Sequence, residues 1–227
     1  MTAATTATTA LRGPKLPRRP ALVEASADDI VEESTLTGRL VRQVDLRGRE
    51  VEHFSLQRSV AAMVEASGAN LGGMAAVDVR FEGCDFSNAT LDTSRWTRIE
   101  AESCKFTGAV FNQTLLQDAR LSDCRADYAQ WQSIKSQGVL FDRCNLHHAF
   151  FNNADLSGVR FLDCDLSEAD FSHANLAGVD LRGSLLERIV ITVDQLRNVT
   201  VTSDQALYLC GLIGLRIDDA APTRRGG

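Results

Sequence analysis

The sequence carries a five-residue repeat that keeps one register through most of its 227 residues. Steps of five from Phe81 reach 25 positions up to Val201, and 22 of them are large and apolar; Ala101, Ala126 and Ser136 are the exceptions. A period of five fits neither the 3.6 of a helix nor the long alternation of a strand. It predicts short extended stretches that point residues i−2 and i to the same side, each followed by a turn.

The positions in steps of five from Phe81 form one column of residues that we expect to point inward. A second inward column lies two residues before the first, and it shows a longer period. Four extended sides close a square, so we expect one coil to take twenty residues and residues twenty apart to stack and resemble one another. They do so in three columns: Cys84, Cys104, Cys124, Cys144 and Cys164; Ala89, Ala109, Ala129, Ala149 and Ala169; and Val79, Ile99, Ala119, Val139, Val159, Val179 and Val199. The sequence therefore predicts a solenoid with a filled core.

Three short runs carry a family resemblance: Asn153–Gly158, Glu168–Ser172 and His173–Gly178. They resemble the A-(D/N)-L-x-x unit of pentapeptide-repeat proteins, over about residues 34–203. The resemblance implies an all-β fold, the right-handed quadrilateral parallel β-helix, here of about eight coils. At about 4.8 Å per coil the rod is about 40 Å long. Arg39 and Arg49 at inward positions, and Gly72-Gly73, depart from the pattern, so we expect the first coils to be distorted there.

Two tails and a cap flank the predicted β-helix. Residues 1–33, rich in Thr and Ala and then in Pro and Arg, are expected to be a disordered tail, with contact to a polyanion or a cloning remnant as alternatives, and residues 218–227 a second tail. Residues 204–217 are expected to form a C-terminal helix, stopping at Gly214, and then a strand. A solenoid end needs such a cap. The cap also suits a homodimer interface, through Leu207, Cys210, Leu212, Ile213 and Leu215.

Charge and hydropathy limit the binding partners and the cellular location that we expect for this protein. The formal charge of −6 disfavours direct binding to nucleic acid, whose phosphates need a basic surface. The sequence contains no run of 18 apolar residues, so it predicts no membrane span, and its N-terminus lacks the pattern of a signal peptide. We therefore expect a cytoplasmic protein whose cysteines are reduced.

The cysteines and histidines, which could suggest a metal site or catalysis, have simpler interpretations. The cysteines lie one per coil without CxxC spacing, which indicates small core residues and no metal site. His147, His148 and His173 fall at outward positions, and no nucleophile pairs with them in the sequence. We therefore expect no enzyme activity and no cofactor.

Acidic residues on the outer surface leave two functional hypotheses. The resemblance implies a DNA mimic, because members of the family bind type II topoisomerases such as DNA gyrase and protect them from poisons. A stiff acidic rod suits a phosphate-binding groove. The residues expected to make that contact are Asp123, Asp142, Asp163, Asp165 and Asp170, although cations share the same edge. The alternative is a scaffold that binds an unknown protein partner.

Overall fold

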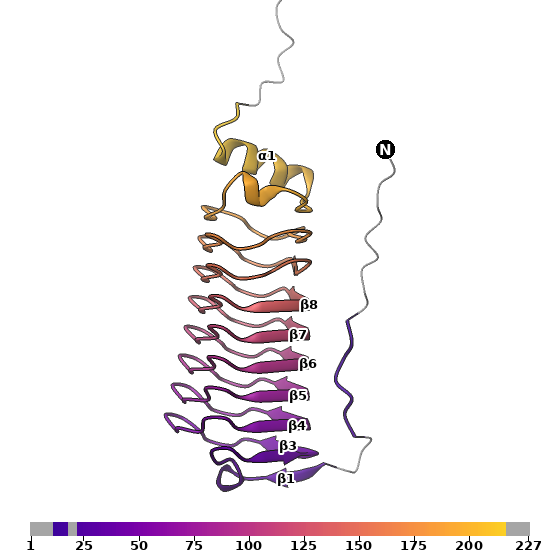
Figure 1. Ribbon diagram of the computed structural model, residues 1–227, viewed down its shortest axis with the longest axis vertical. Helices are drawn as coiled ribbons and strands as arrows, with labels where there is room; N and C mark the ends of the chain where they lie inside the picture. The colour runs from indigo at the N-terminus through magenta and orange to yellow at the C-terminus, as the bar shows by residue number, and fades with distance from the viewer. Residues whose placement is uncertain (1–10, 18–21, 217–227) are drawn as a thin grey trace, which may run out of the picture.

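The computed structural model describes residues 11–17 and 22–216. The chain is a parallel β-solenoid of about seven turns that ends in one short helix (Figure 1), which confirms the predicted fold class. The expected count of eight included the stretch near residue 195, where a 3₁₀ turn replaces the repeat.

One nine-stranded sheet contains all the named strands, and every pairing in it is parallel. Its strands are β1 (Val23–Ala25), β2 (Thr35–Thr37), β3 (Arg39–Arg42), β4 (Ser55–Ala62), β5 (Ala75–Glu82), β6 (Arg95–Glu102), β7 (Leu115–Ser122), β8 (Lys135–Asp142) and β9 (Arg160–Leu162). The helical elements are η1 (Ala27–Asp29), η2 (Asp194–Leu196) and α1 (Ser203–Leu212).

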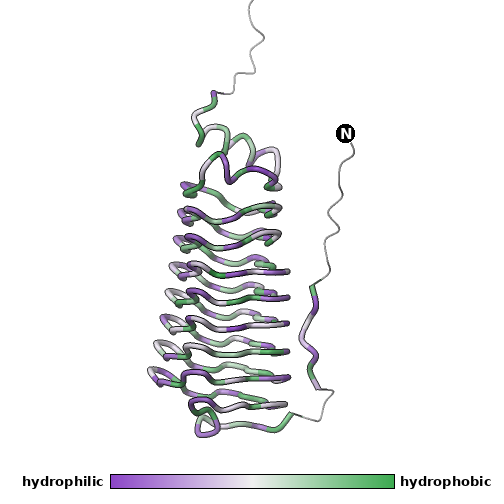
Figure 2. The backbone as a smooth tube through the Cα atoms, in the orientation of Figure 1, coloured by the Kyte–Doolittle hydropathy of each residue, from purple (hydrophilic) through white to green (hydrophobic). Residues whose placement is uncertain are grey.

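The register between neighbouring coils is twenty residues, as the sequence predicts. Ser55 pairs with Ala75, Ala75 with Arg95 and Arg95 with Leu115. Outside the strands, single parallel bridges continue the same spacing in further columns, such as Asp45 to Glu65 and Glu50 to Asn70. Each coil therefore hydrogen-bonds to the next along several of its sides, and Figure 2 shows hydrophilic and hydrophobic residues alternating along every coil.

Aromatic side chains twenty residues apart stack in the core. Phe111 and Trp131 lie 4.1 Å apart with an interplanar angle of 6°, and Phe141 and Phe161 lie 5.0 Å apart at 6°. Rings on opposite sides of the square, ten residues apart, instead meet edge-on, as Phe151 does with Phe161 at 76°. Offset stacks and edge contacts are the favourable geometries for aromatic pairs. The predicted inward columns are thus a continuous core.

The N-terminal boundary of the β-helix lies earlier than residue 34. Strand β1 pairs in parallel with β3, with Val23 opposite Arg39. This offset of sixteen shows a first coil shortened by four residues. The expectation of a disordered tail over 1–33 is therefore wrong for residues 22–33, because Ala25 and Ile30 are buried in the core. The sequence signal fails there because this coil does not keep the five-residue period.

A second segment of the expected tail lies along the rod. Leu11–Pro17 runs beside the coils (Figure 1), and the Lys15 amide donates a 2.8 Å hydrogen bond to the Asp78 carboxylate. Asp78 also binds the Arg98 guanidinium through two hydrogen bonds of 2.6 and 2.7 Å. Residues 1–10 and 18–21 lie outside the described residues, as does the tail predicted for 218–227.

The expected distortion at Gly72-Gly73 does not occur, since strands β4 and β5 on either side keep the twenty-residue register. Gly73 adopts a φ of +69°, and a Cβ atom there would collide with the His53 ring of the preceding coil. Arg49 does not point into the core either: its side chain reaches out to the Ala27 carbonyl at 3.0 Å. The short first coil leaves room for this contact.

Helix α1 closes the C-terminal end. Thr202 is its N-cap, and the Gln205 side chain donates to the carbonyls of Leu181 and Ser184, both at 2.7 Å. These two carbonyls belong to the last coils, so Gln205 satisfies an otherwise open edge. The strand predicted over 215–217 is absent at Leu215 and Arg216, which follow a turn, and residue 217 lies outside the described part. Within the described residues no helix is long and apolar enough to cross a membrane.

Candidate functional site

Two of the predicted acidic residues are neutralised by arginines. The Arg143 guanidinium makes two 2.8 Å hydrogen bonds to the Asp123 carboxylate in the preceding coil and a third, of 2.7 Å, to Asp142. Arg120 donates to the other Asp142 oxygen at 2.6 Å. The twenty-residue stack places Arg143 directly beside Asp123, and this contact holds the pKa of the Asp123 carboxyl below its usual value. This part of the acidic edge is therefore a network of positively and negatively charged side chains.

Asp163 and Asp165 lie farther toward the C-terminal end. Asp163 stacks in the column of Asp123 and Arg143, and its carboxylate lies over Gly183, where a Cβ would collide with it. Asp165 accepts a 2.9 Å hydrogen bond from the Ser167 amide and lies in the next column, opposite Asn145 and Leu185. Among the described residues neither carboxylate forms an ion pair with a lysine or arginine.

Asp170 lies on a different side of the rod. Its bridge partners are Phe150 and Val190, one pentapeptide beyond the Asp165 column. Its carboxylate accepts hydrogen bonds from the Ser172 amide at 2.8 Å and the Asn152 side chain at 2.7 Å. Burial opposes ionisation, but these hydrogen bonds from Ser172 and Asn152 outweigh it and keep the pKa of Asp170 below its usual value. The five predicted residues thus span two sides of the rod.

The cysteine column forms a buried stack, as predicted. All five of its cysteines are buried and unbridged. Their thiols donate to backbone carbonyls, as Cys144 does to Leu121 at 3.4 Å. Hydrogen bonds among the stacked thiols raise the pKa of Cys104 and of Cys164 and lower that of Cys84 and of Cys144. Each thiol of the column is enclosed in the core, as expected of a small packing residue.

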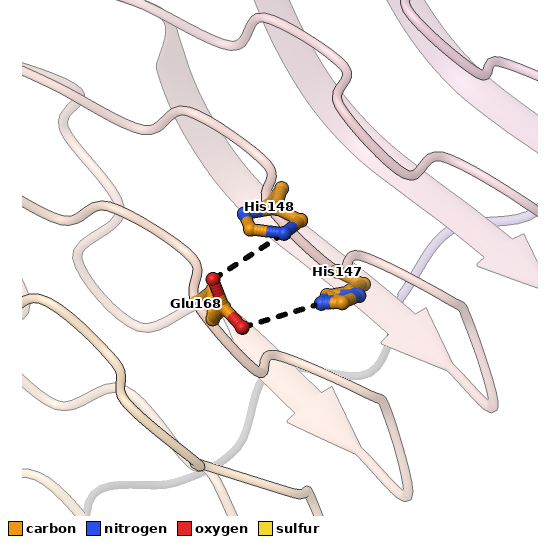
Figure 3. Close-up of side chains that lie close together, drawn as sticks. All are labelled: His147, His148 and Glu168. Atoms are coloured by element: carbon orange, nitrogen blue, oxygen red, sulfur yellow. Dashed lines mark ion pairs between the residues drawn. The ribbon is translucent and has the colours of Figure 1, made fainter.

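Two histidines and a glutamate meet at one corner, which the sequence analysis missed (Figure 3). The Nε2 atom of His148 lies 3.3 Å from one Glu168 oxygen, and that of His147 lies 3.9 Å from the other. The two imidazoles stack at 4.2 Å, and Tyr128 stacks on His148 at 4.8 Å. The signal was present in the sequence, because His148 and Glu168 are twenty residues apart and therefore occupy the same column.

The residues predicted for a dimer interface lie on and after α1. Leu207, Leu212 and Leu215 are exposed, and Cys210 and Ile213 are half-buried. Leu209, by contrast, packs into the end of the core. The helix therefore covers the last coil with one side and presents apolar side chains on the other.

Comparison with known proteins agrees with the repeat. A family model described as a pentapeptide repeat region matches residues 76–151, and one described as pentapeptide repeats (8 copies) matches residues 151–188. No curated protein sequence matches the chain.

Solved structures of similar shape include HetL, a pentapeptide repeat protein involved in heterocyst differentiation regulation from the cyanobacterium Nostoc sp. strain PCC 7120. It is 16% identical, with a TM-score of 0.46, and the alignment covers 74% of this chain and 87% of HetL. A trypsin-treated variant of QnrB1, a plasmid-mediated fluoroquinolone resistance protein, is 21% identical with a TM-score of 0.47, over 87% of this chain and 96% of QnrB1.

The two family models adjoin at residue 151 and together span the most regular coils. The register of twenty residues, the four-sided coil and the stacked core support the same assignment from the structure. On this combined basis the chain is a pentapeptide-repeat protein.

Proposed function

We propose that this protein is a non-catalytic DNA mimic that binds the DNA-binding groove of a type II topoisomerase such as DNA gyrase, in the cytoplasm, and protects the enzyme from a poison. The observation that carries the proposal is the group of uncompensated carboxylates near the C-terminal end. Asp163, Asp165 and Asp170 are held by neutral donors or lie exposed, and in the described residues they have no arginine or lysine ion-pair partner.

This arrangement moves the expected contact along the rod. Asp123 and Asp142 share the charges of Arg120 and Arg143, so that stretch contributes little net field. The carboxylates of Asp163, Asp165 and Asp170 have no such cation beside them in an ion pair within the described residues, and hydrogen bonds between coils fix the backbone that carries them. A preformed acidic surface binds a basic groove without a large cost in conformational entropy. Electrostatic complementarity also makes such binding dependent on salt.

The test is a gyrase supercoiling assay with and without a poison. We expect the wild-type protein to inhibit supercoiling or to rescue it from the poison, and to bind gyrase less tightly as salt rises. Changing Asp163, Asp165 and Asp170 together to asparagine is expected to weaken binding by about tenfold or more, because even one close charge pair across an interface contributes about 1.5 kcal/mol or more.

A charge-matched variant at the opposite end is the control. It carries the same loss of three negative charges on exposed side chains: Glu24→Gln, Asp28→Asn and Glu32→Gln. We expect its binding to stay within about twofold of wild type, since these residues lie outside the proposed contact. Equal losses in both triple variants, or the absence of inhibition, rescue and salt-sensitive binding in the wild type, would refute the proposed contact.

The alternative, a scaffold for another protein, is favoured by the segment Leu11–Pro17. It lies along the rod and is anchored at Asp78, so it is a second surface that a partner can recognise. Deleting residues 1–17 separates the hypotheses. A DNA mimic keeps its gyrase binding, whereas recruitment through this segment is lost in a pull-down.

We also propose that two copies associate end to end through α1. The exposed Leu207, Leu212 and Leu215 leave an apolar surface at the capped C-terminal end of the solenoid, which a second copy of the same end covers. Light scattering is expected to give the mass of a dimer for the wild type and that of a monomer for Leu207→Ser/Leu212→Ser. Monomers in both samples exclude the interface.

A further inference from the structure

A corner of the rod near residue 148 brings three potential metal ligands together, and nothing in the proposed topoisomerase contact uses them. His147 and His148 occupy the turn of one coil, and Glu168 occupies the equivalent turn of the next (Figure 3). One ligand atom from each residue lies within 4.8 Å of the other two. In the described residues this is the single group of His, Cys, Asp and Glu side chains with that property.

The backbone fixes where these side chains start. The His148 amide donates to the Ser167 carbonyl at 3.0 Å, and the Glu168 amide donates to the Glu187 carbonyl at 2.7 Å. Both residues have a positive φ, +54° and +58°, so the two turns have the same shape and project their side chains in the same direction. Only side-chain rotations then separate the three ligands from a common centre.

One ring nitrogen in the cluster lacks a partner. The Nε2 atom of His147 is shielded from solvent and has no hydrogen-bond partner among the described residues, because its distance of 3.9 Å to Glu168 is too long for a hydrogen bond. A buried polar atom without a partner carries a free-energy cost of about 1–3 kcal/mol. A lone pair in that position gains most from a cation placed between it and the carboxylate.

We propose that His147, His148 and Glu168 bind one divalent transition-metal ion of the zinc, cobalt and nickel group. Two imidazole nitrogens and one carboxylate oxygen are a donor set that these ions favour over magnesium or calcium. Ligands of a tetrahedral zinc ion lie about 2.0–2.1 Å from the metal and therefore about 3.3 Å from one another. The two distances from the imidazole nitrogens to the carboxylate, 3.3 and 3.9 Å, are close to that value, and all three ligand atoms lie within 4.8 Å of one another.

Binding requires a small local change. The imidazoles are stacked with an interplanar angle of 16°, so their nitrogen lone pairs lie in nearly parallel planes. The two rings must tilt toward the ion, while the Tyr128 ring of the preceding coil stacks on His148. Three protein ligands leave a fourth position on the ion open to water or to a side chain of a partner.

Arg188 competes with a bound metal ion for the Glu168 carboxylate. Its guanidinium pairs with the Glu168 carboxylate in the absence of metal. The ion and the guanidinium are both cations that draw on one carboxylate, so metal binding displaces Arg188 or weakens its pairing. Removing the positive charge at position 188 must therefore tighten metal binding, an effect that a purely structural cluster does not produce.

The experiment is a titration of the full-length, metal-free protein with Zn²⁺ by calorimetry, together with Co²⁺ absorption spectra. We expect one tight equivalent and a cobalt spectrum typical of nitrogen and oxygen ligands, without a thiolate band. His148→Ala and Glu168→Gln are each expected to weaken Zn²⁺ binding by about tenfold or more, and Arg188→Gln to tighten it about threefold or more. Circular dichroism checks that each variant keeps its fold.

Matched controls separate this site from other ligands. His53→Ala and Cys210→Ser remove a histidine and a partly exposed thiol elsewhere and are expected to change the affinity by less than about twofold. The proposal is overturned if Zn²⁺ binds His148→Ala and Glu168→Gln as tightly as wild type, if Cys210→Ser alone abolishes binding, or if no equivalent binds. Gyrase binding is a separate measurement, so failure of one proposal leaves the other standing.

Discussion

Replacing Trp131 with alanine is expected to lower the free energy of unfolding by about 3–5 kcal/mol, measured by guanidinium denaturation followed by far-ultraviolet circular dichroism. The Trp131 side chain is fully buried and stacks between Phe111 of the preceding coil and Phe151 of the next, at 4.1 and 6.3 Å. The coils above and below are held by parallel hydrogen bonds, so they cannot collapse into the space. The cavity therefore remains, together with the loss of aromatic contacts.

Two further variants define the cause. Trp131→Phe keeps a ring in the stack and also removes an Nε1–H group that has no hydrogen-bond partner in the described structure, so its loss is expected to be well below that of alanine. Tyr128→Ala removes an exposed aromatic from the same coil, and its effect is expected to stay within about 0.5 kcal/mol. A loss at Trp131→Ala no larger than that at Tyr128→Ala would contradict the stacked core.

Enlarging Ala149 to leucine is expected to destabilise the protein by about 1–3 kcal/mol, toward the upper end of that range. Ala149 is fully buried and lies between Ala129 and Ala169 of the adjoining coils. The amide of Phe150 donates to Ala129 and that of Asp170 donates to Ala149, both at 2.9 Å. Additional volume in this column can be admitted only by lengthening these bonds, so packing and hydrogen bonding are weakened together.

The matched control places the same substitution on the outside. Ala177 is exposed at a turn position, and Ala177→Leu is expected to change the free energy of unfolding by less than about 0.5 kcal/mol. Thermal unfolding followed by circular dichroism compares the two. If Ala149→Leu matches Ala177→Leu, the alanine column does not set the distance between coils, and the predicted close stacking is wrong.

Both expected results depend on features of the core that the sequence predicts. The five-residue register predicted which side chains point inward, and the twenty-residue period predicted that Cys124 would lie between Cys104 and Cys144. These predictions are correct because burial and strand direction are local properties that repeat identically in each coil. The errors fall where the repeat weakens: the first coil, shortened by four residues at Val23, and the strand expected at Leu215.

The surface was predicted less well than the core. The sequence placed acidic residues on one edge, but it did not show that Arg143 reaches two carboxylates at once or that Asp170 belongs to another side. Outward side chains are long and rotate freely, so their partners depend on rotamers and on neighbours in other coils. A repeat period fixes which residues are neighbours, and it does not fix which of them pair.

The sequence by itself determined the solenoid, its twenty-residue coil and the residues that fill it, because these follow from periodicity and from the exclusion of apolar side chains from water. The tertiary structure decided the location of the uncompensated charge and the meeting of His147, His148 and Glu168 at one corner. Those features depend on how side chains of adjacent coils are oriented toward one another. The order of residues makes these side chains neighbours but does not fix their orientations.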